Sequence, residues 1–485
     1  MKMIMKQLIY AVSFGVFLLT ASVLSTPLEK RSKVEWKSEP FKCDYDEEKL
    51  EGIVKWTITD SLSCEYDGCG ERPVILVHRT GDCPNCNNFP APTICAKPKQ
   101  HIRIEVTNNL TKSKEATTIH WHGFLMKIEE NTPFSDGVPA KTQCPIQYGE
   151  KFVYNFWASD EPGTHWYHSH YKPQRMDGLY GLNVNNIPPE DQALSATFEP
   201  VPHSVLINGK GQGVCKGKVE VTCTDAKDFH DLSEECATYR LRITNAGALI
   251  EYYFYIDGHK LQVIEVEGQK VNHEESKWVN RVPIHIWQRQ TPNVRYNTPF
   301  TMFTDQNKDE PVTVGEAYAG ASSSQSSSWN YSSNILILDE RGDTIEVTLA
   351  SADRISPSLP FGFRINIERA KCTYADMHDV REFCKKHGHF FEVIQTLEYL
   401  KDPIKYANPI SRDTVTVPPK GTAIIRFKVD NPGVWAFHCH IEWHVEVGMM
   451  AQFVELPNEI LGLKFPEEKK DWDNLCKNTA TTAAS

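Results

Sequence analysis

Three features are scarce or missing in this chain of 485 residues. No apolar run after Leu24 is long enough to cross a membrane. Helical patterns are few, and "PEEKKDWDNLCK" near the end is the best of them. Positive charge is also in short supply, with 52 Lys and Arg against 63 Asp and Glu and a net charge of −11. These absences argue against a polytopic membrane protein, a helical fold and a nucleic-acid partner.

The amino-terminal segment has the pattern of a targeting signal. Lys2 and Lys6 precede an apolar run from Leu8 to Leu24, and Ser25 follows Val23 by two positions. A basic start, an apolar stretch and small residues are typical of a secretory signal peptide, here residues 1–25. An uncleaved anchor is the alternative, and Lys30-Arg31 is a second processing candidate. We therefore expect a secreted, extracellular protein without stable membrane association.

The cysteine content agrees with export. Disulfides persist outside the cytosol, and the chain has 14 cysteines, six of them between residues 43 and 95. We interpret Cys83-Pro-Asn-Cys86 as disulfide framework rather than a redox or zinc half-motif. If Cys439 binds a metal, 13 of the 14 cysteines remain. Because 13 is odd, at least one of them is left over when the others pair as disulfides. Asn109 and Asn330 begin possible glycosylation motifs.

Alternating apolar residues predict an all-β protein. They recur in "HIRIEVTNNL" (101–110), "TYRLRITNAG" (238–247) and "DTIEVTLAS" (343–351). Such period-2 stretches, bounded by Asn and Gly, indicate half-buried strands. The three stretches resemble one another and lie slightly over a hundred residues apart, which predicts three copies of one β-sandwich domain.

Loop composition places the boundaries between these copies. "NNIPPEDQ" (185–192) and "GASSSQSSSWNYSS" (320–333) are plausible linkers. We expect domains at 34–186, 187–320 and 330–460, each a Greek-key sandwich. The middle one is apparently abbreviated, because the expected strands after residue 290 are short.

Histidines around a cysteine carry the strongest chemical signal. In "FHCHIEWH" (437–444), strand alternation puts His438 and His440 on one face and Cys439 on the other. A thiolate with imidazoles and a weak axial thioether is the ligand set of a blue copper centre. His444 and Met449 follow at spacings that could return to the face of Cys439.

Two further histidine clusters lie far upstream. "TIHWHG" contributes His120 and His122, and "GTHWYHSH" contributes His168 and His170, with His165 nearby. A single His-x-His pair often occurs by chance. Three such clusters in one exported β protein indicate transition-metal binding, because neutral imidazole is the commonest metal ligand.

These clusters resemble those of multicopper oxidases, and specifically animal-type laccases. "DNPGVWAFHCHIEWHVEVGM", "QRMDGLYG", "DGVPAKTQCPI" and "HSVLINGKGQ" carry the resemblance, which covers nearly the whole chain after the signal peptide. It implies three cupredoxin-like domains. It also implies a type 1 copper that takes electrons from a substrate, and a trinuclear cluster, one type 2 and two type 3 coppers, that reduces dioxygen to water.

The resemblance also implies roles for individual residues. Cys439, His444 and Met449 resemble type 1 copper ligands, and His120 resembles a type 2 ligand. The type 3 ligands correspond to His122, His168, His170, His387, His438 and His440. Cys439, His438 and His440 would form the electron path, and Asp136 and Glu442 match carboxylates near the cluster.

One family motif is degenerate here. Where laccases have His-Pro-x-His-Leu-His-Gly, this chain reads "EFCKKHGHFFEVIQ" (382–395). Glu382 falls at the type 1 histidine and Lys385 at the type 2 histidine, both poor replacements. His378 and His389 are the only other histidines near this motif in the sequence. The preceding residues 357–386 do not resemble the family, which indicates either a gene-model error or a degenerate paralogue.

The expected function is that of a secreted laccase-like enzyme. It would oxidise diphenols or related phenolic compounds one electron at a time and reduce dioxygen, as a monomer. A ferroxidase is the alternative enzyme, although Met176 occupies the loop where iron-oxidising relatives place an acid. The third reading is a catalytically impaired copper-binding paralogue.

Overall fold

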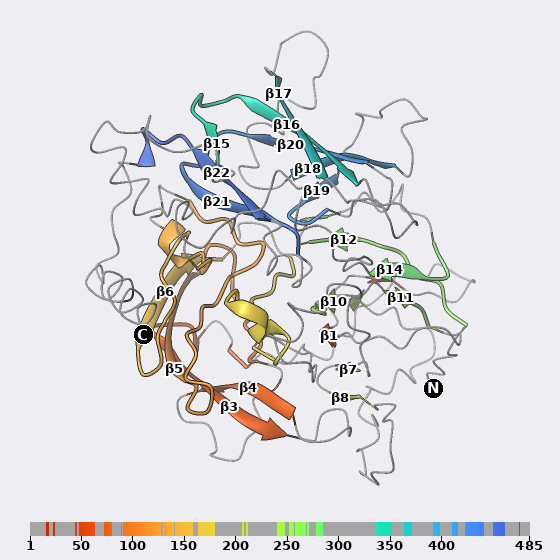
Figure 1. Cartoon of the computed structure of the whole chain (residues 1–485). Coiled ribbons are helices and arrows are strands. Elements are labelled where there is room, and N and C mark those ends of the chain that lie inside the picture. The colour runs from red at the N-terminus through yellow and green to blue at the C-terminus, as the bar shows by residue number, and fades with distance from the viewer. Residues whose placement is uncertain are drawn as a thin grey trace, which may run out of the picture.

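The computed structural model is built almost wholly from strands (Figure 1). Among the described residues, two short 3-10 turns interrupt the strands, η1 (Pro133–Ser135) and η2 (Lys172–Arg175). The structure describes residues 16–18, 23–24, 44–45, 48–63, 72–79, 89, 91–127, 130, 132–139, 141–158, 163–179, 206–207, 210–211, 240–247, 252–256, 258–267, 269–270, 278–284, 335–351, 363–370, 391–397, 410–415, 422–440, 450–460 and 475. The all-β prediction is confirmed.

The first third of the chain forms a four-stranded sheet in the order β4-β3-β5-β6. Its strands are β3 (Val54–Ser63), β4 (Arg72–Arg79), β5 (His101–Asn109) and β6 (Lys151–Trp157). β3 pairs parallel with β5, and the other pairings are antiparallel. The alternation predicted for β5 is confirmed, since Ile102, Ile104 and Val106 are buried and their neighbours are not.

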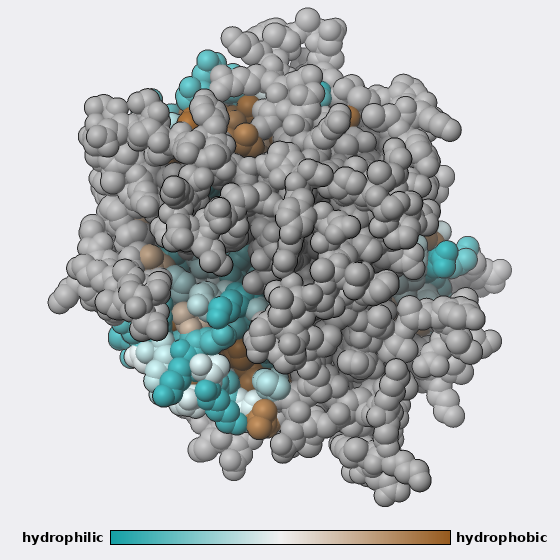
Figure 2. Space-filling view, in the orientation of Figure 1, coloured by the Kyte–Doolittle hydropathy of each residue, from teal (hydrophilic) through white to brown (hydrophobic). Residues whose placement is uncertain are grey.

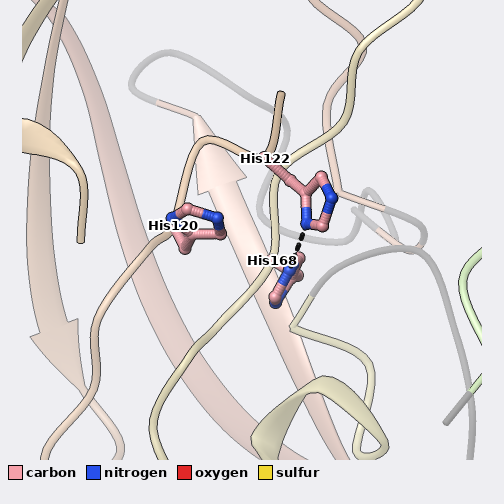
Figure 3. A group of neighbouring side chains, drawn as sticks. All are labelled: His120, His122 and His168. Carbon is pink, nitrogen blue, oxygen red and sulfur yellow. Dashed lines mark hydrogen bonds between the residues drawn. The ribbon is translucent and has the colours of Figure 1, made fainter. Parts of the chain in front are cut away.

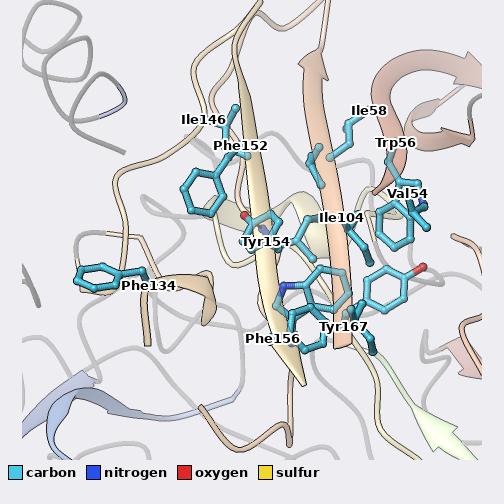
Figure 4. Close-up of a cluster of buried hydrophobic side chains, with 14 of the residues drawn as sticks. Val54, Trp56, Ile58, Ile104, Phe134, Ile146, Phe152, Tyr154, Phe156 and Tyr167 are labelled. Atoms are coloured by element: carbon cyan, nitrogen blue, oxygen red, sulfur yellow. Dashed lines mark hydrogen bonds between the residues drawn. The ribbon is translucent and has the colours of Figure 1, made fainter. Parts of the chain in front are cut away.

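An aromatic core lies on the inner face of this sheet (Figure 4). Trp121 packs against Tyr154, Phe156 and Tyr167 with ring centroids 4.6–5.6 Å apart. Trp121 separates His120 from His122, and Tyr167 directly precedes His168. Packing these rings therefore fixes the backbone from which the histidines project.

The last third forms two further sheets at the top of Figure 1. One has the order β17-β16-β20-β18-β19 and the other β15-β22-β21. Their bounds are β15 (Ile335–Leu338), β16 (Thr344–Ser351), β17 (Phe363–Ala370), β18 (Phe391–Leu397), β19 (Ile410–Arg412), β20 (Thr422–Lys428), β21 (Gly433–His438) and β22 (Met450–Glu455). Phe427 of β20 meets Phe453 of β22 at 5.2 Å, so the two sheets pack face to face as a sandwich.

The middle of the chain contributes only short described strands. They are β7 (Leu206–Ile207), β8 (Lys210–Gly211), β9 (Arg240–Leu241), β10 (Thr244–Asn245), β11 (Tyr252–Phe254), β12 (Glu265–Val266), β13 (Gln269–Lys270) and β14 (Val282–Ile284). Ile243 and Leu261 form its small buried core. The strand predicted at 238–247 is thus divided into two pairs of residues, β9 and β10.

Two strands lie within the predicted signal segment. β1 (Val16–Leu18) pairs with β7 and β10, and β2 (Val23–Leu24) pairs with β9. The signal-peptide assignment and the domain boundaries remain predictions. Of the carboxy-terminal helix predicted at 466–477, Leu475 is described, and it is helical and buried.

The first and last thirds of the chain share one interface. Val434, Val454 and Ile460 belong to the same buried cluster as the core of the first sheet. The Asn431 side-chain amide donates to Met126 O at 2.7 Å across this boundary. On the face in Figure 2 the described surface is mostly hydrophilic, with apolar residues in small groups. Within the described ranges, no helix has the length and apolar character needed to cross a bilayer.

Candidate metal centre

Two of the three histidine segments are joined by their backbones. The His120 N–H donates to His168 O at 2.7 Å, and the His168 N–H donates back to His120 O at 3.0 Å. This isolated β-bridge brings "TIHWHG" and "HWYHSH" side by side. The imidazole of His120 consequently lies 5.4 Å, centroid to centroid, from that of His168.

Three imidazole nitrogens converge on one point. His122 Nδ1 lies 3.4 Å from His168 Nε2 and 3.3 Å from His440 Nε2. Two nitrogens bound at about 2.0 Å to one ion at near-tetrahedral angles lie about 3.3 Å apart. The spacing therefore fits a shared metal ion. Figure 3 shows His122 facing His168, with His120 beside them.

A second pair of nitrogens lies next to the first group. His170 Nε2 is 3.0 Å from His438 Nε2, and their rings meet edge to face at 4.8 Å. The ring of His120 lies 5.4–5.5 Å from those of His122, His168 and His170. The ligand atoms of His120, His122 and His168 all lie within 4.8 Å of one another. All six predicted histidines within the described ranges therefore form one cluster.

Backbone carbonyls orient three of these rings. His120 Nδ1 is 2.6 Å from Asp136 O, and His168 Nδ1 is 2.7 Å from Ser169 O. His438 Nδ1 is 2.8 Å from Cys439 O. A carbonyl oxygen can only accept, so in each ring the proton is on Nδ1 and the lone pair of Nε2 is available for a metal.

His122 is oriented the other way round. Its Nε2 lies 3.3 Å from Thr414 Oγ1 and 3.4 Å from the Asp413 carboxylate. The proton therefore belongs on Nε2, and Nδ1 faces the cluster. Burial opposes ionisation of Asp413, but the charge and hydrogen bond of His122 outweigh it and hold the pKa of Asp413 well below its usual range.

Burial keeps the clustered imidazoles neutral. It lowers the pKa of His120 to about 3 and that of His438 to about 4. The pKa values of His168, His170 and His440 are also well below 6.5, first because of burial and then because of neighbouring cationic groups. Neutral imidazole is the form that binds metals.

This depression of pKa makes the metal-free protein acid-sensitive. A buried histidine stays neutral in the native state but takes a proton in the unfolded state below about pH 6.5, so the free energy of unfolding falls as the pH drops through that value. Asp136 and Asp177 have pKa values raised to about 7, which makes the native state more stable as the pH falls, but they are fewer than the buried histidines. We expect a lower urea midpoint at pH 5 than at pH 7.5. A double variant, His168→Gln with His440→Gln, should show a smaller change of the urea midpoint between the two pH values. An equal change in both proteins would contradict this expectation.

Asp136 is held against His120 by a loop that requires glycine. Gly137 has φ 79°, and a Cβ there would lie 1.8 Å from Ile119 O. Only glycine permits this approach, which brings Asp136 Oδ1 to 3.5 Å from His120 Nδ1. Burial raises the pKa of Asp136 to about 7, although His122 opposes the shift. This carboxyl can therefore hold or release a proton near neutral pH.

Several residues at the cluster were not predicted from the sequence. Arg175 is buried and approaches His440 Nδ1 at 2.7 Å, while donating to His440 O at 3.0 Å. Gln174 accepts from Ser169 Oγ at 3.0 Å, between two predicted ligands. Trp166 packs on His168 at 4.3 Å. In the sequence, Arg175 and Gln174 were noted only as part of "QRMDGLYG", a stretch that resembles the family, and no role was assigned to them.

The remaining predicted site residues divide into two groups. Cys439 is partly buried and forms no disulfide, whereas the other cysteines in the described ranges, Cys95 and Cys144, are disulfide-bonded. His165 lies beside the cluster rather than in it, with its ring 4.9 Å from Phe124. His387, Glu442, His444 and Met449 fall outside the described residues, as do Glu382 and Lys385.

Comparison with known proteins agrees with this geometry. Three family models described as multicopper oxidase match residues 80–189, 164–299 and 386–459, together more than half of the chain. The iron transport multicopper oxidase fio1 of Schizosaccharomyces pombe is 28% identical over 87% of this chain and 79% of its own length. Laccase-5 of Trametes villosa is 29% identical over 74% of this chain and 83% of its own.

A solved structure supports the fold independently. The crystal structure of Fet3p, a multicopper oxidase that functions in iron import, superposes with a TM-score of 0.54. It covers 88% of this chain and 95% of that one at 18% sequence identity, which establishes a cupredoxin-like all-β fold. With the three family matches and the histidine cluster, this shows that the chain belongs to the multicopper oxidase family of copper-dependent oxidoreductases, which carry type 1, type 2 and type 3 copper.

Proposed function

We propose that this protein is a laccase-like oxidase that couples one-electron oxidation of phenolic substrates to the four-electron reduction of dioxygen to water. The proposal rests on two groups of imidazole nitrogens, and within each group the facing nitrogens lie 3.0–3.4 Å apart. The first and the last third of the chain both contribute to each group. Copper supplies the redox chemistry when bound. The chain supplies neutral ligands, their orientation and a proton-holding carboxyl.

The grouping of the type 3 ligands follows from which nitrogens face one another, and the other assignments are those that the family resemblance implies. His122, His168 and His440 would hold one type 3 copper. His170 and His438 would hold the other, completed by His387. His120 would hold the type 2 copper. Cys439, His444 and Met449 would hold the type 1 copper, a His–Cys–Met set that suits a blue copper site.

Chain connectivity couples the two kinds of site. Cys439 lies between His438 and His440 in sequence, and the two imidazoles lie side by side with centroids 5.9 Å apart. An electron accepted at Cys439 would thus reach either type 3 copper through a few covalent bonds. Asp136, whose pKa is raised to about 7, lies where protons are consumed at the His120 side. Glu442 would be a second carboxylate of this kind, as the family resemblance implies.

The substrate separates two candidate activities. The name of fio1 and the function given for Fet3p favour iron oxidation, whereas Laccase-5 favours phenols. Met176 is 3% exposed at the loop position where iron-oxidising relatives carry an acid. The neighbouring Asp177 has its pKa raised to about 7, chiefly by burial. Met176 offers no carboxylate for Fe(II), and the raised pKa of Asp177 favours its protonated form, so we favour the phenol oxidase.

Steady-state kinetics distinguish the two activities. We expect oxygen consumption with a diphenol to have the larger kcat/KM, and Fe(II) to be a poor substrate. The copper-loaded full chain is compared on both substrates at one pH, with metal-free protein as the blank. A higher kcat/KM for Fe(II) would establish the ferroxidase instead. If neither substrate supports oxygen consumption, the result would favour the impaired copper-binding paralogue.

Secretion belongs to the same proposal. The basic start and apolar run of residues 1–25 motivate it, as do the cysteine content and the possible glycosylation site at Asn109. Amino-terminal sequencing of protein from culture medium should give a mature chain starting near Thr26 or after Arg31. Recovery only from membranes, with Met1 retained, would favour an anchored protein.

A further inference from the structure

A hairpin from the middle of the chain lies beside the metal centre. β12 (Glu265–Val266) and β13 (Gln269–Lys270) form a two-stranded hairpin, and Glu267 lies in the turn between them. None of the predicted copper ligands comes from this part of the chain. Its contacts with the two neighbouring parts nevertheless converge beside His122.

Glu267 fixes the backbone of the residues that hold His122. Its Oε2 accepts the N–H of Asp413 at 3.0 Å and the N–H of Thr414 at 3.1 Å. Two N–H groups that donate to one carboxyl oxygen define the position of that oxygen relative to both residues. The segment that follows β19 is thereby tied to the middle hairpin.

Asp413 and Thr414 in turn fix the tautomer of His122. The Thr414 hydroxyl donates to Asp413 Oδ1 at 3.0 Å, and its oxygen lies 3.3 Å from His122 Nε2. A hydroxyl that has donated its proton can only accept from the imidazole. His122 Nε2 must therefore carry a proton, which leaves Nδ1 for the metal.

The fit around these residues is close. Gly123, directly after His122, has φ 79°, and a Cβ there would lie 2.7 Å from Asp413 Oδ2 and 3.0 Å from His165 Nδ1. Asp413 is thus confined between Gly123 on one side and Glu267 on the other. A shift of either support would move the imidazole of His122.

The same turn also holds the other ligand segment. Glu265 Oε1 accepts the N–H of Thr164 at 3.0 Å, four residues before His168, and Arg242 donates to the Thr164 hydroxyl. One hairpin thus touches the chain on both sides of the cluster. Its geometry at Glu267 is strained, with φ 49° in a residue that is not glycine. Such strain persists where the surroundings enforce it, often at functional sites.

We propose that Glu267 is a positioning residue for copper binding, acting through Asp413 and Thr414 on His122. The inference rests on the proposed function, because it assumes that His122 binds copper. It gives the middle domain a part in the trinuclear cluster although that domain contributes no ligand. It also gives a role to the acidic residue with strained geometry at this turn.

Copper titration of the metal-free full chain against a competing chelator tests this proposal. Glu267→Ala removes the acceptor and is expected to weaken copper binding by roughly 10–100-fold, as for other residues that orient metal ligands. Glu267→Gln keeps an acceptor oxygen and should recover most of the affinity. Glu51→Ala, at an exposed loop position, is the matched control and should bind like the unmodified chain.

Two further variants separate positioning from general stability. Asp413→Ala combined with Glu267→Ala should cost little more affinity than the larger single change, because both act on His122. Glu267→Gly relieves the strained φ, so its metal-free Tm should be no lower than that of Glu267→Ala while its copper binding stays weak. Wild-type affinity in Glu267→Ala would overturn the inference alone. Failure of the unmodified chain to bind copper would overturn the proposed function with it.

Discussion

Replacing Cys439 with serine is expected to abolish diphenol oxidation in any active form of this protein. The soft thiolate of Cys439 would be a strong ligand for the type 1 copper, and a serine hydroxyl is a harder and weaker one. Residue 439 also lies between His438 and His440, so weaker copper bonding at this position would also weaken the electronic coupling to the cluster. We expect turnover at background, measured as oxygen uptake with a diphenol.

The copper content of the same variant shows where the loss arises. The histidine cluster does not include the thiol, so Cys439→Ser should keep the copper bound by His168, His170 and their neighbours. Ala436→Ser, in strand β21 shortly before Cys439, is the matched control and should retain turnover. Wild-type turnover in Cys439→Ser with full copper loading would refute the electron path.

Restoring histidine at Glu382 and Lys385 together is expected to raise both blue absorbance and diphenol turnover. Glutamate is a hard ligand and a protonated lysine binds copper poorly, so the chain as written should show little blue absorbance and low activity. The third family match begins at residue 386, directly after these two positions. Optical and electron paramagnetic resonance spectra of the copper-loaded proteins measure the change.

Each single replacement serves as a control for the double one. Glu382→His alone should strengthen the blue band with little gain in turnover, because the type 2 site would still lack its second histidine. A normal blue band and normal turnover in the unmodified protein would show instead that His378 or His389 supplies the missing ligand. Sequencing the transcript across residues 350–395 shows whether this segment is genuine.

Much of the fold could be predicted because burial imposes a simple period on strands. Buried apolar residues recur at every second position in β5 and β16, for example at Ile104 and Val347, and both strands were found from that alternation. The stretch at 238–247 shows the limit of this signal. Its alternation is equally clear, yet it forms only β9 and β10, because pairing depends on partner strands that alternation within one segment does not specify.

The metal ligands could be predicted for a different reason. Copper needs several imidazoles at once, so the ligands occur as His-x-His pairs that are visible in the sequence. Their supports give no such signal. Thr414 lies 292 residues from His122, and Glu267 lies 146 residues from Asp413. Ordinary threonine, aspartate and glutamate acquire their roles only when the fold brings these segments together.

Copper stoichiometry of the purified full chain tests the central claim most directly. Metal-free protein is saturated with copper, freed of excess and analysed, together with a His168→Ala, His170→Ala variant and a His78→Ala, His101→Ala control. The two nitrogen groups predict at least two tightly bound copper ions in the unmodified chain and in the control, and fewer in the cluster variant. Equal copper content in all three proteins, or none in the unmodified chain, would contradict the assignment of this cluster as the copper centre.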